Sequence, residues 1–438
     1  MLSPFRGGIH PSENKHFSVN KPFTSLSIPH LAYLPLKQHI GSAAKPLVKK
    51  EDFVQEGQKI AEAEGPISSH VHSSIPGKVI DITETETIYG NQPTIIIEAE
   101  GSFTNFFNQK KESWENLTPP EILEKIKAAG IVGLGGAAFP TNVKLSPPPG
   151  KKIETLIING AECEPYLTVD DMLMQTFPKE IIEGIKIVLK ILGIKKAIIG
   201  IEKNKPKALE ALEEVLLTEN PLEEIEIKPL KTKYPQGAEK QLIYSLLKKE
   251  VPSQKLPMDI GVVVKNVGTI FAIREAVLFD KPLFERYITV SGELINNPGN
   301  YKVKLGTKIS DLINDCGGLK DKPTKIIVGG PMCGLAINNL EMPVVKGFSG
   351  ILFLSKKEAG LHNKSNCIRC GKCISACPVG LMPCDIREAI ESNRLDLIKN
   401  VNPFDCIMCS SCSYVCPANN PLSHYLALAQ DKFKKEKS

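Results

Sequence analysis

The cysteines near the C-terminal end of the chain constrain its fold more than any other feature. The stretch CIRCGKCISACPVG, residues 367–380, has the spacing C-x2-C-x2-C-x3-C, and a proline follows the last cysteine. The stretch CIMCSSCSYVCPAN, residues 406–419, repeats both the spacing and the proline. Most of the chain's 12 cysteines therefore belong to one repeated pattern, which is typical of a paired metal site.

This spacing predicts two [4Fe-4S] clusters that exchange a ligand. Three cysteines of a C-x2-C-x2-C loop wrap one cluster, and in the two-cluster bacterial pattern the fourth cysteine ligates the other cluster. The pattern assigns to the first cluster Cys367, Cys370, Cys373 and Cys416. It assigns to the second cluster Cys377, Cys406, Cys409 and Cys412.

Two zinc sites are the alternative interpretation of the same cysteines. Zinc motifs favour two C-x2-C pairs at a longer separation, so the doublet favours iron–sulfur clusters. Cys384 follows Pro383 and is expected not to be a ligand, and its role is left open. Three isolated cysteines are interpreted as small apolar residues, namely Cys163, Cys316 and Cys333.

The whole chain has the composition of a globular protein with several domains. Its 438 residues exceed the usual size of one domain, and its net charge of +5 is too small to indicate nucleic-acid binding. It contains no run of about 18 uncharged apolar residues, and its N-terminus lacks an apolar signal core. We therefore expect a soluble, cytoplasmic chain that reaches a membrane only through partners, where cysteine clusters indicate metal sites rather than disulfides.

Residues 1–110 are predicted to contain a small β domain. Short apolar runs alternate with turn signals such as Glu56-Gly57 and Pro76-Gly77, a rhythm similar to that of lipoyl-type barrel-sandwich domains. The tip region AEAEGPISSH has no lysine that could carry a prosthetic group, and Lys59 lacks the expected neighbours. We therefore interpret this domain as structural.

Residues 111–285 are predicted to form a Rossmann-like α/β domain. A helix is expected to start after Thr118, where Pro119 and Glu121 supply the first-turn signals. Four apolar segments then each precede a helical pattern: TLIIN (155–159), KAIIGI (196–201), EIEIKPL (224–230) and DIGVVV (259–264). This alternation predicts a parallel sheet covered by helices.

The remaining residues are predicted to form two further units. Residues 286–350 return to strands around the turn NNPGN and a short helix, which suggests a soluble, ligand-binding β-grasp module. Residues 351–438 carry the cysteine doublet and are predicted to form a helical two-cluster domain of bacterial-ferredoxin type. The predicted fold class is therefore a multidomain α/β protein.

The segment GLGGAAFPT, residues 133–141, is a glycine-rich loop that matches a dinucleotide-binding motif only in part. It fits G-x-G-x-x-A, but it follows a helix rather than a strand, and Pro140 blocks the helix that should follow. Its glycines would let backbone N–H groups approach a phosphate or a flat ring closely. The alternative is a tight turn between domains.

Polar clusters follow three of the four predicted strands and favour a ligand site. They are Asn159, Glu162 and Glu164 after the first strand, Tyr234, Gly237 and Glu239 after the third, and Asn266 and Thr269 after the fourth. In a parallel sheet these positions share the carboxyl edge, where open α/β sheets bind ligands. The clusters are therefore interpreted as one site.

At these motifs the chain resembles a known family. GLGGAAFPTNVK, NGAECEP and KNVGT are similar to the FMN and NADH site of the flavoprotein subunit of respiratory complex I. The complete order of segments, ending in the cysteine doublet, resembles the C subunits of Rnf complexes, the membrane ferredoxin–NAD oxidoreductases. Two departures from the complex I motifs are Ala138, where GAGFP becomes GAAFP, and Ala161, where NADE becomes NGAE.

The resemblance implies residue roles at the site. Glu164 and Glu239 would lie toward the nicotinamide nucleotide and act in catalysis. FMN would be held by Gly133, Gly135, Gly136, Ala137, Lys144, Asn159, Glu162, Gly237, Asn266 and Thr269.

The resemblance also implies the function of the chain. It would pass electrons between NAD(H), FMN and two [4Fe-4S] clusters, as a peripheral subunit on the cytoplasmic side of the cell membrane. Its partners would be the integral-membrane and other subunits of an Rnf complex, and indirectly ferredoxin, but no nucleic acid. Two alternatives are a cobalamin reductase of related build, in which the cluster segment lies mid-chain, and a nonenzymatic scaffold with structural clusters.

Overall fold

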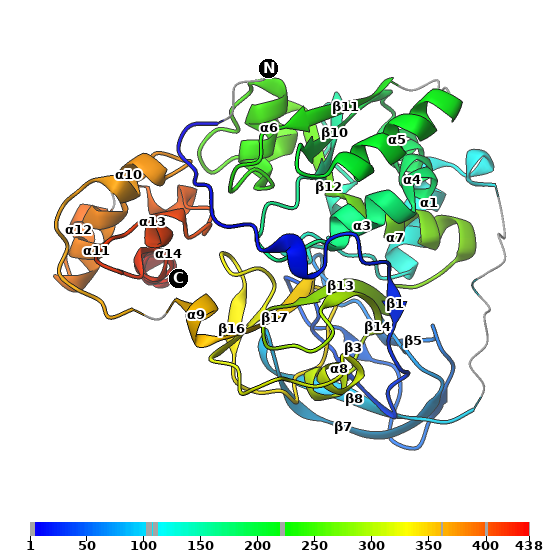
Figure 1. The fold of residues 1–438 in the computed structure, drawn as a ribbon. Coiled ribbons are helices and arrows are strands. Elements are labelled where there is room, and N and C mark those ends of the chain that lie inside the picture. The colour runs from blue at the N-terminus through cyan, green and yellow to red at the C-terminus, as the bar shows by residue number, and fades with distance from the viewer. Residues whose placement is uncertain are drawn as a thin grey trace.

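The computed structural model describes residues 5–101, 107, 113–219, 224–360, 362–398 and 402–437. The predicted domain boundary between residues 110 and 111 lies outside these residues. Figure 1 shows the cysteine-rich domain at one end of the molecule and the helix-covered sheet and the β-rich part at the other. Among the described residues, no helix combines the length and apolar character needed to cross a membrane.

The predicted parallel sheet is confirmed. It is formed by β9 (Thr155–Gly160), β10 (Lys196–Glu202), β11 (Glu224–Leu230) and β12 (Val262–Asn266), in the order β11-β10-β9-β12 with all pairs parallel. The strand expected at 259–264 begins only at Val262, because Pro257–Ile260 form a 3-10 turn that ends at Gly261 with φ 75°.

Helices cover both faces of this sheet. Leu156 and Ile158 of β9 face one side of the sheet and share an apolar core with buried residues of α1, α4, α5 and α7. Ile157 faces the other side and packs with α6. Residues alternate in this way because successive side chains of a strand face opposite sides. The helices of the domain are α1 (Pro119–Ala128), α2 (Thr141–Lys144), α3 (Val169–Thr176), α4 (Pro178–Leu192), α5 (Pro206–Glu219), α6 (Glu239–Leu247) and α7 (Val267–Phe279).

The N-terminal β domain consists of two small sheets. One is formed by β2 (Leu31–Pro35), β4 (Phe53–Val54), β7 (Gly77–Thr87) and β8 (Gly90–Ala99), and the other by β3 (Lys45–Pro46), β5 (Lys59–Glu62) and β6 (Val71–His72). Ile95 and Ile97 of β8 share one apolar core with Ile288 and Phe353 of the next sheet. The two β units therefore stabilise each other through one continuous core.

A mixed sheet of six strands follows. Its order is β1-β14-β13-β17-β15-β16, with β1 (Thr24–Ser25), β13 (Glu285–Ser291), β14 (Gly299–Lys304), β15 (Lys325–Val328), β16 (Leu335–Ile337) and β17 (Gly350–Leu354), and α8 (Ile309–Asp315) lies beside it. Strand β1 comes from the N-terminal segment, and β17 crosses the predicted boundary at residue 350. Both pair with strands far away in sequence, which local patterns do not indicate.

The cysteine-rich domain is small and helical. It contains α10 (Lys372–Ala376), α11 (Pro383–Glu391), α12 (Leu395–Ile398), α13 (Ser411–Tyr414) and α14 (Leu422–Lys437), and α9 (Lys356–Ala359) precedes it. Ile386, Leu422 and Leu426 are buried together with Cys373 and Cys412 in a core of its own. The cysteine motifs therefore contribute part of the apolar interior of this domain.

Residues 5–18, here called the N-terminal strap, connect the other domains. The strap is the dark blue segment that runs between the sheet domain and the cysteine-rich domain in Figure 1. The Gly8 N–H donates to Ala376 O at 2.9 Å, and Ile9 exchanges two backbone hydrogen bonds with Tyr234 at 2.8 and 2.9 Å. Ser18 O accepts from the side chain of Asn300 at 3.0 Å. The strap thus contacts three domains within a short stretch of chain.

A buried basic cluster lies between the barrel-sandwich domain and the sheet domain. The Lys346 ammonium donates to His70 O at 2.6 Å and Gly130 O at 2.8 Å, and burial lowers its pKa to about 7. Burial also lowers the pKa of His39 and of His70 to about 4, and that of His72 well below its usual value. These imidazoles are therefore neutral at pH 7.

We predict that this junction weakens in mild acid. A histidine whose pKa is lower in the folded state costs stability as the pH falls from about 6.5 toward 4, because the unfolded chain then binds more protons. The Ser69 N–H donates to Nε2 of His39 at 3.0 Å, and a protonated ring cannot accept that bond. Hydrogen exchange of the Ser69 amide, corrected for its intrinsic pH dependence, should therefore lose protection between pH 7 and pH 5.

Two variants distinguish protonation of His39 from a general loss of stability of the fold in acid. His39→Asn should flatten the pH dependence of Ser69 protection, whereas His424→Asn, at an exposed position, should leave it unchanged. Equal protection at both pH values in the unmodified chain would contradict the prediction.

Candidate functional site

The glycine-rich loop lies beside the carboxyl edge of the parallel sheet. Its base is closed by hydrogen bonds from Gly133 N to Phe139 O at 2.8 Å and from Thr141 N to Ile131 O at 3.0 Å. The buried Thr269 hydroxyl accepts from Leu134 N at 2.9 Å and ties the loop to α7. The side chain of Thr269 therefore anchors the loop rather than facing open space.

The tip of the loop is exposed and consists of Gly135, Gly136 and Ala137. A Cβ added at Gly135 would lie 3.1 Å from the Cβ of Asn266, so a larger side chain there would press on the start of α7. Gly136 has φ 124° and no heavy atom within 4 Å of an added Cβ. The tip thus offers backbone groups to a ligand at close range.

Two asparagines order the loops that follow the strands. Asn266 caps α7, since its Oδ1 accepts from Gly268 N at 2.8 Å and Thr269 N at 3.3 Å. Asn159 donates from Nδ2 to Gly237 O at 2.8 Å and thereby joins the loops after β9 and β11. The structure therefore brings these predicted site residues together at one edge.

Lys144 and Glu239 form an ion pair across this edge. Lys144 ends α2 next to the glycine-rich loop, Glu239 begins α6, and their side chains are 30% and 38% exposed. Each still has free surface for a ligand. The neighbouring Lys265, at the end of β12, is buried, and burial holds its pKa well below the usual value. Lys265 lies within the quoted KNVGT motif, but the sequence did not single it out.

Glu162 is held inside a network of charges under the strap. Its carboxylate accepts from Asp170 N at 2.8 Å and Asp171 N at 3.1 Å, in the first turn of α3 where negative charge is favoured. Burial raises the pKa of Glu162, while Lys15 and Lys205 oppose this. Glu162 is thus an organising residue of the edge.

Lys15 of the strap is a functional candidate that the sequence did not indicate. Its ammonium donates to Glu162 O at 3.0 Å, Glu164 O at 3.1 Å and Leu167 O. Part of the Lys15 side chain reaches the surface, but its ammonium is enclosed. Burial lowers the pKa of Lys15, and the positive charge of Lys205 lowers it further. No local motif around Lys15 signals this distant contact.

The pKa of Lys205 is raised, whereas the pKa of Lys15 is lowered. Burial lowers the pKa of Lys205, but Glu202 at 3.3 Å and Glu162 outweigh the burial, so the net shift is upward. Lys15 donates to neutral carbonyl groups instead. The two lysines together neutralise the carboxylates below the strap.

Glu164 is covered by a loop of the mixed sheet. Its carboxylate accepts from Met332 N and Cys333 N, both at 3.0 Å, and from the Tyr234 hydroxyl at 3.3 Å. A Cβ at Gly330 would come 2.1 Å from Glu164 Oε2, so the close approach requires glycine. Burial raises the pKa of Glu164. The two residues predicted to face the nicotinamide, Glu164 and Glu239, therefore have different surroundings.

Two of the isolated cysteines lie at this site and make polar contacts there. Cys163 Sγ accepts from Gly237 N at 3.2 Å. Cys333 Sγ lies 3.0 Å from the Tyr234 hydroxyl and 3.6 Å from Met408 O in the second cysteine motif. Cys163 also packs against a small apolar cluster that includes Ile9 and Tyr234, so its interpretation as a small apolar residue holds in part. That interpretation is wrong for Cys333, which is exposed and makes polar contacts, whereas Cys316 is buried in the core as expected.

A polar pocket opens between the strap and the sheet edge. It lies beside the carboxyl ends of β10 and β11 and has about 380 Å³ of empty space. Its lining includes His10, Glu13, Lys15, Cys163, Glu202, Asn204, Lys233 and Tyr234.

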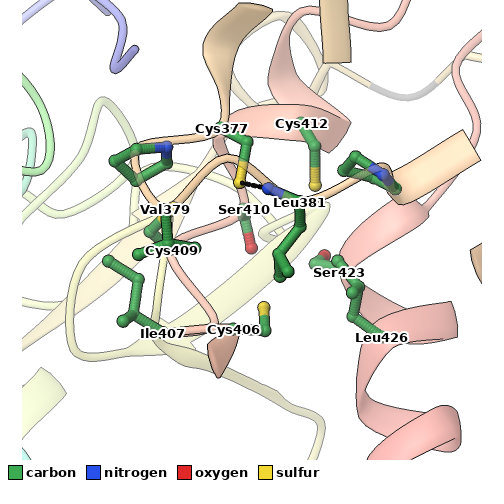
Figure 2. A pocket seen from close by; sticks show the side chains of 12 residues that line it. Cys377, Val379, Leu381, Cys406, Ile407, Cys409, Ser410, Cys412, Ser423 and Leu426 are labelled. Carbon is green, nitrogen blue, oxygen red and sulfur yellow. Dashed lines mark hydrogen bonds between the residues drawn. The ribbon is translucent and has the colours of Figure 1, made fainter. Parts of the chain in front are cut away.

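The eight predicted cluster cysteines line two separate pockets. Figure 2 shows the first, here called the inner pocket, whose cysteines are Cys377, Cys406, Cys409 and Cys412. The second, here called the outer pocket, is lined by Cys367, Cys370, Cys373 and Cys416, and also by Cys384. Each pocket thus gathers three cysteines of one motif and the fourth of the other.

Backbone N–H groups point at the cysteine sulfurs in the same way in both motifs. Arg369 N donates to Cys367 Sγ and Met408 N donates to Cys406 Sγ, each at 3.4 Å. The fourth cysteines accept from the residues four positions later, Leu381 at 3.3 Å and Asn420 at 3.4 Å. Such donors stabilise thiolates and tune iron–sulfur clusters.

The surroundings of these thiols fit [4Fe-4S] clusters. Most of the other residues that line the inner pocket are apolar, such as Val379, Leu381 and Ile407, and Ser410 and Ser423 also line it, as Figure 2 shows.

Comparisons with protein families match four parts of the chain. A Nuo51 FMN-binding domain matches residues 126–275 and a 4Fe-4S dicluster domain matches residues 359–417. An RnfC barrel sandwich hybrid domain matches residues 3–102 and an SLBB domain matches residues 287–336. The prediction of a multidomain α/β chain with FMN and [4Fe-4S] clusters is thereby confirmed.

Two solved structures share the fold at low sequence identity. Both are of an NAD+-reducing [NiFe]-hydrogenase. The air-oxidised state aligns with a TM-score of 0.50 at 20% identity, over 72% of this chain and 62% of that chain. The H2-reduced state aligns with a TM-score of 0.51 at 19% identity, over 75% of this chain and 62% of that chain.

Curated relatives are much more similar. The C subunit of the proton-translocating ferredoxin:NAD(+) oxidoreductase complex of Clostridium ljungdahlii is 46% identical, over 87% of this chain and 83% of the relative. The C subunit of the Na(+)-translocating complex of Acetobacterium woodii is 42% identical, over 92% of this chain and 90% of the relative. The C subunit of the ion-translocating oxidoreductase complex of Rhodobacter capsulatus is 42% identical, over 99% of this chain and 84% of the relative. This chain therefore belongs to the family of C subunits of ion-translocating ferredoxin:NAD(+) oxidoreductase complexes, the Rnf family that its motifs resemble.

Proposed function

We propose that this chain is the peripheral electron-transfer subunit of such a complex, acting between NAD(H), FMN and two [4Fe-4S] clusters. One observation carries the proposal. A single chain joins two four-cysteine pockets to a sheet that matches an FMN-binding domain, and the segment of the inner pocket contacts the carboxyl edge of that sheet through Cys333 and Tyr234. The names of the relatives, which are subunits of ferredoxin:NAD(+) oxidoreductases, agree with this function.

We assign the flavin to the exposed tip of the glycine-rich loop and the loops opposite it. FMN, when bound, exchanges a hydride with nicotinamide and single electrons with iron–sulfur clusters. The proposed contacts are the exposed backbone of Gly135, Gly136 and Ala137, with Lys144 and Gly237 at the rim. Asn159, Glu162, Asn266, Thr269 and Gly133 hold those loops in place through the hydrogen bonds described above.

We assign the nicotinamide nucleotide to the side of Glu239. Its carboxylate stays partly exposed next to Lys144, whereas Glu164 is enclosed by the loop of Gly330. Glu164 then acts as a positioning residue, since it fixes Tyr234 and the loop that leads to Met408.

The clusters are assigned to the two pockets with crossed ligation. The inner pocket takes its cysteines from residues 406–412 and Cys377, and the outer pocket from residues 367–373 and Cys416. Cys384 lines the outer pocket as an additional thiol without a role as ligand in this assignment. We further propose that the three later domains are of Rossmann-like, β-grasp and bacterial-ferredoxin type. The predicted boundaries at 286 and 351 would cut β13 and β17, so we place these boundaries before Glu285 and after Leu354.

The partners in this proposal are the integral-membrane and other subunits of the complex, with the chain on the cytoplasmic side of the membrane. The cobalamin reductase alternative is not favoured, because the strong relatives are subunits of ion-translocating complexes.

An anaerobic titration with NADH tests the proposal. The holoprotein should show bleaching of its flavin absorbance by NADH and should then reduce an artificial one-electron acceptor. It should move no ions across vesicles until its membrane partners are added. A holoprotein whose flavin is not bleached by NADH would instead support a nonenzymatic scaffold.

We predict that Gly135→Val expels FMN and leaves the clusters in place. The valine side chain would meet Asn266, whose Cβ is 3.1 Å from the first added atom, and would fill the space at the loop tip. Flavin content per chain should fall by about tenfold, equivalent to roughly 1.4 kcal/mol of binding free energy. Flavin fluorescence after denaturation and iron analysis measure both cofactors.

Ala336→Val supplies the control for this prediction. Ala336 is exposed on β16, away from the loop, so a valine there should change neither flavin nor iron content. Full flavin occupancy in Gly135→Val would count against the assigned flavin site.

A further inference from the structure

Leu134 leads into the exposed tip of the glycine-rich loop, and both of its backbone polar groups are hydrogen-bonded. Its N–H donates to the Thr269 hydroxyl of α7 at 2.9 Å. Its carbonyl accepts from Nη2 of Arg286 at 3.3 Å. Thr269 belongs to the sheet domain, whereas Arg286 belongs to β13 of the mixed sheet. Two domains therefore hold the loop immediately before Gly135.

Arg286 occupies a position of β13 at which the strand otherwise buries apolar side chains. It shares one face of the strand with Ile288 and Val290, which belong to the core of the two β units. Arg286 is itself only 5% exposed. Burying a guanidinium is costly unless its N–H groups find acceptors. The packing of the core alone therefore does not explain an arginine at this position.

The acceptors of Arg286 connect the mixed sheet to the loop. Its Nε and Nη2 donate to Phe348 O at 3.0 and 2.6 Å, and Nη2 also donates to Leu134 O. Phe348 is fully buried, which keeps its carbonyl in place. Because a guanidinium is planar and presents its N–H groups in fixed directions, it sets the distance between these two carbonyl groups.

The residues that precede the Phe348 carbonyl also lie against the glycine-rich loop. Lys346 donates to Gly130 O, just after α1, at 2.8 Å. A Cβ added at Gly347 would lie 3.7 Å from Gly136 O at the tip. This segment of the chain therefore supports the loop from its base to its tip.

Arg286 also acts on the loop through charge. Burial lowers the pKa of Arg286 to about 10 and the Asp170 carboxyl opposes this shift, so the guanidinium stays charged at neutral pH. The same carboxyl accepts from Asn266 Nδ2 at 2.6 Å. Asn266 is the residue that an added side chain at Gly135 would meet. Arg286 is thus connected to both sides of the tip.

We propose that Arg286 is a positioning residue of the flavin site, which holds the tip of the glycine-rich loop in the conformation that binds FMN. This inference rests on the proposed function and adds to the site a residue from outside the sheet domain. The match to an FMN-binding domain ends at residue 275, so it does not include Arg286. Arg286 acts through the backbone of Leu134, and the mixed sheet thereby becomes part of the flavin site.

The test measures the dissociation constant of FMN from the flavin that the holoprotein releases on serial dilution. Arg286→Met keeps a side chain of similar length but loses every donor, so it should bind FMN about tenfold more weakly. Arg286→Lys keeps the charge but not the planar fork, so its affinity should fall by about threefold. The visible circular dichroism of the bound flavin at saturating FMN should change in both variants, because the tip of the loop is displaced.

Arg274→Met is the matched control. Arg274 is also largely buried, but it donates to the Glu183 and Glu275 carboxylates and lies about two turns along α7 from Asn266. Its replacement should lower the free energy of unfolding and leave the FMN affinity and the dichroism unchanged. An equal loss of FMN in Arg274→Met, or unmodified affinity in Arg286→Lys and Arg286→Met, would overturn the positioning role. If Arg286→Met does not fold, the comparison of Arg286→Lys with the unmodified chain decides in the same way.

Bleaching of the flavin by NADH is measured on the same samples. If the FMN affinities follow the expected order but NADH does not bleach the flavin, the proposed function fails while the positioning role stands. If NADH bleaches the flavin but the affinities are all equal, only the positioning role fails.

Discussion

Replacing Cys377 by serine is expected to disrupt the cluster of the other motif. Cys377 belongs to the first motif by sequence, yet it lines the inner pocket with Cys406, Cys409 and Cys412. Iron–sulfur clusters require soft thiolate ligands, so a serine oxygen in that position should cost about half of the iron in the chain. Cys416→Ser should affect the outer pocket in the same way.

Four variants measured together decide the ligation. The EPR spectrum of reduced Cys377→Ser should match that of Cys406→Ser, and Cys416→Ser should match Cys367→Ser. NADH should still bleach the flavin in all four. If Cys377→Ser instead resembles Cys367→Ser, each motif binds its own cluster and the crossed assignment is wrong.

Replacing Lys15 by methionine is expected to destabilise the chain strongly. The Lys15 ammonium binds three carbonyl groups of the segment 162–167 and lies near the Glu162 carboxylate. Methionine keeps the length of the stem but leaves those acceptors and the carboxylate without their cation. Removing one partner of a buried charged network typically costs about 3 kcal/mol or more.

The free energy of unfolding in urea measures this loss. Lys21→Met is the matched control, since the Lys21 ammonium also binds a backbone carbonyl, Pro298 O, but at an exposed position. The control should lose less than about 1 kcal/mol. A Lys15→Met chain as stable as the control would mean that the strap is held by its backbone contacts alone.

The sequence predicts the elements with local signals well. The strands at 155–159, 196–201 and 224–230 are each dominated by β-branched residues or alternate in polarity, and the first and third of them end next to a polar cluster. The cysteine spacing predicts which residues share a pocket, because short spacers leave few geometric choices. The resemblance adds the cofactors, which no periodicity could supply.

The sequence fails where distant segments decide the structure. The strap crosses the sheet edge through Lys15, and β1 and β17 join strands that lie far from them in sequence. The enclosure of Glu164 depends on Gly330, which belongs to another domain. These contacts depend on how the domains pack against each other. Patterns within a short stretch of sequence therefore cannot predict them.

The shared pockets also fix an order of biosynthesis. The outer pocket needs Cys416 of the second motif, and the inner pocket needs Cys406, Cys409 and Cys412 of the same motif. Neither pocket is therefore complete until the second motif has left the ribosome. Domains generally fold as units from the N-terminal end during synthesis. The sheet and β domains can therefore fold before either cluster has all its ligands, so both clusters can be completed only late in synthesis.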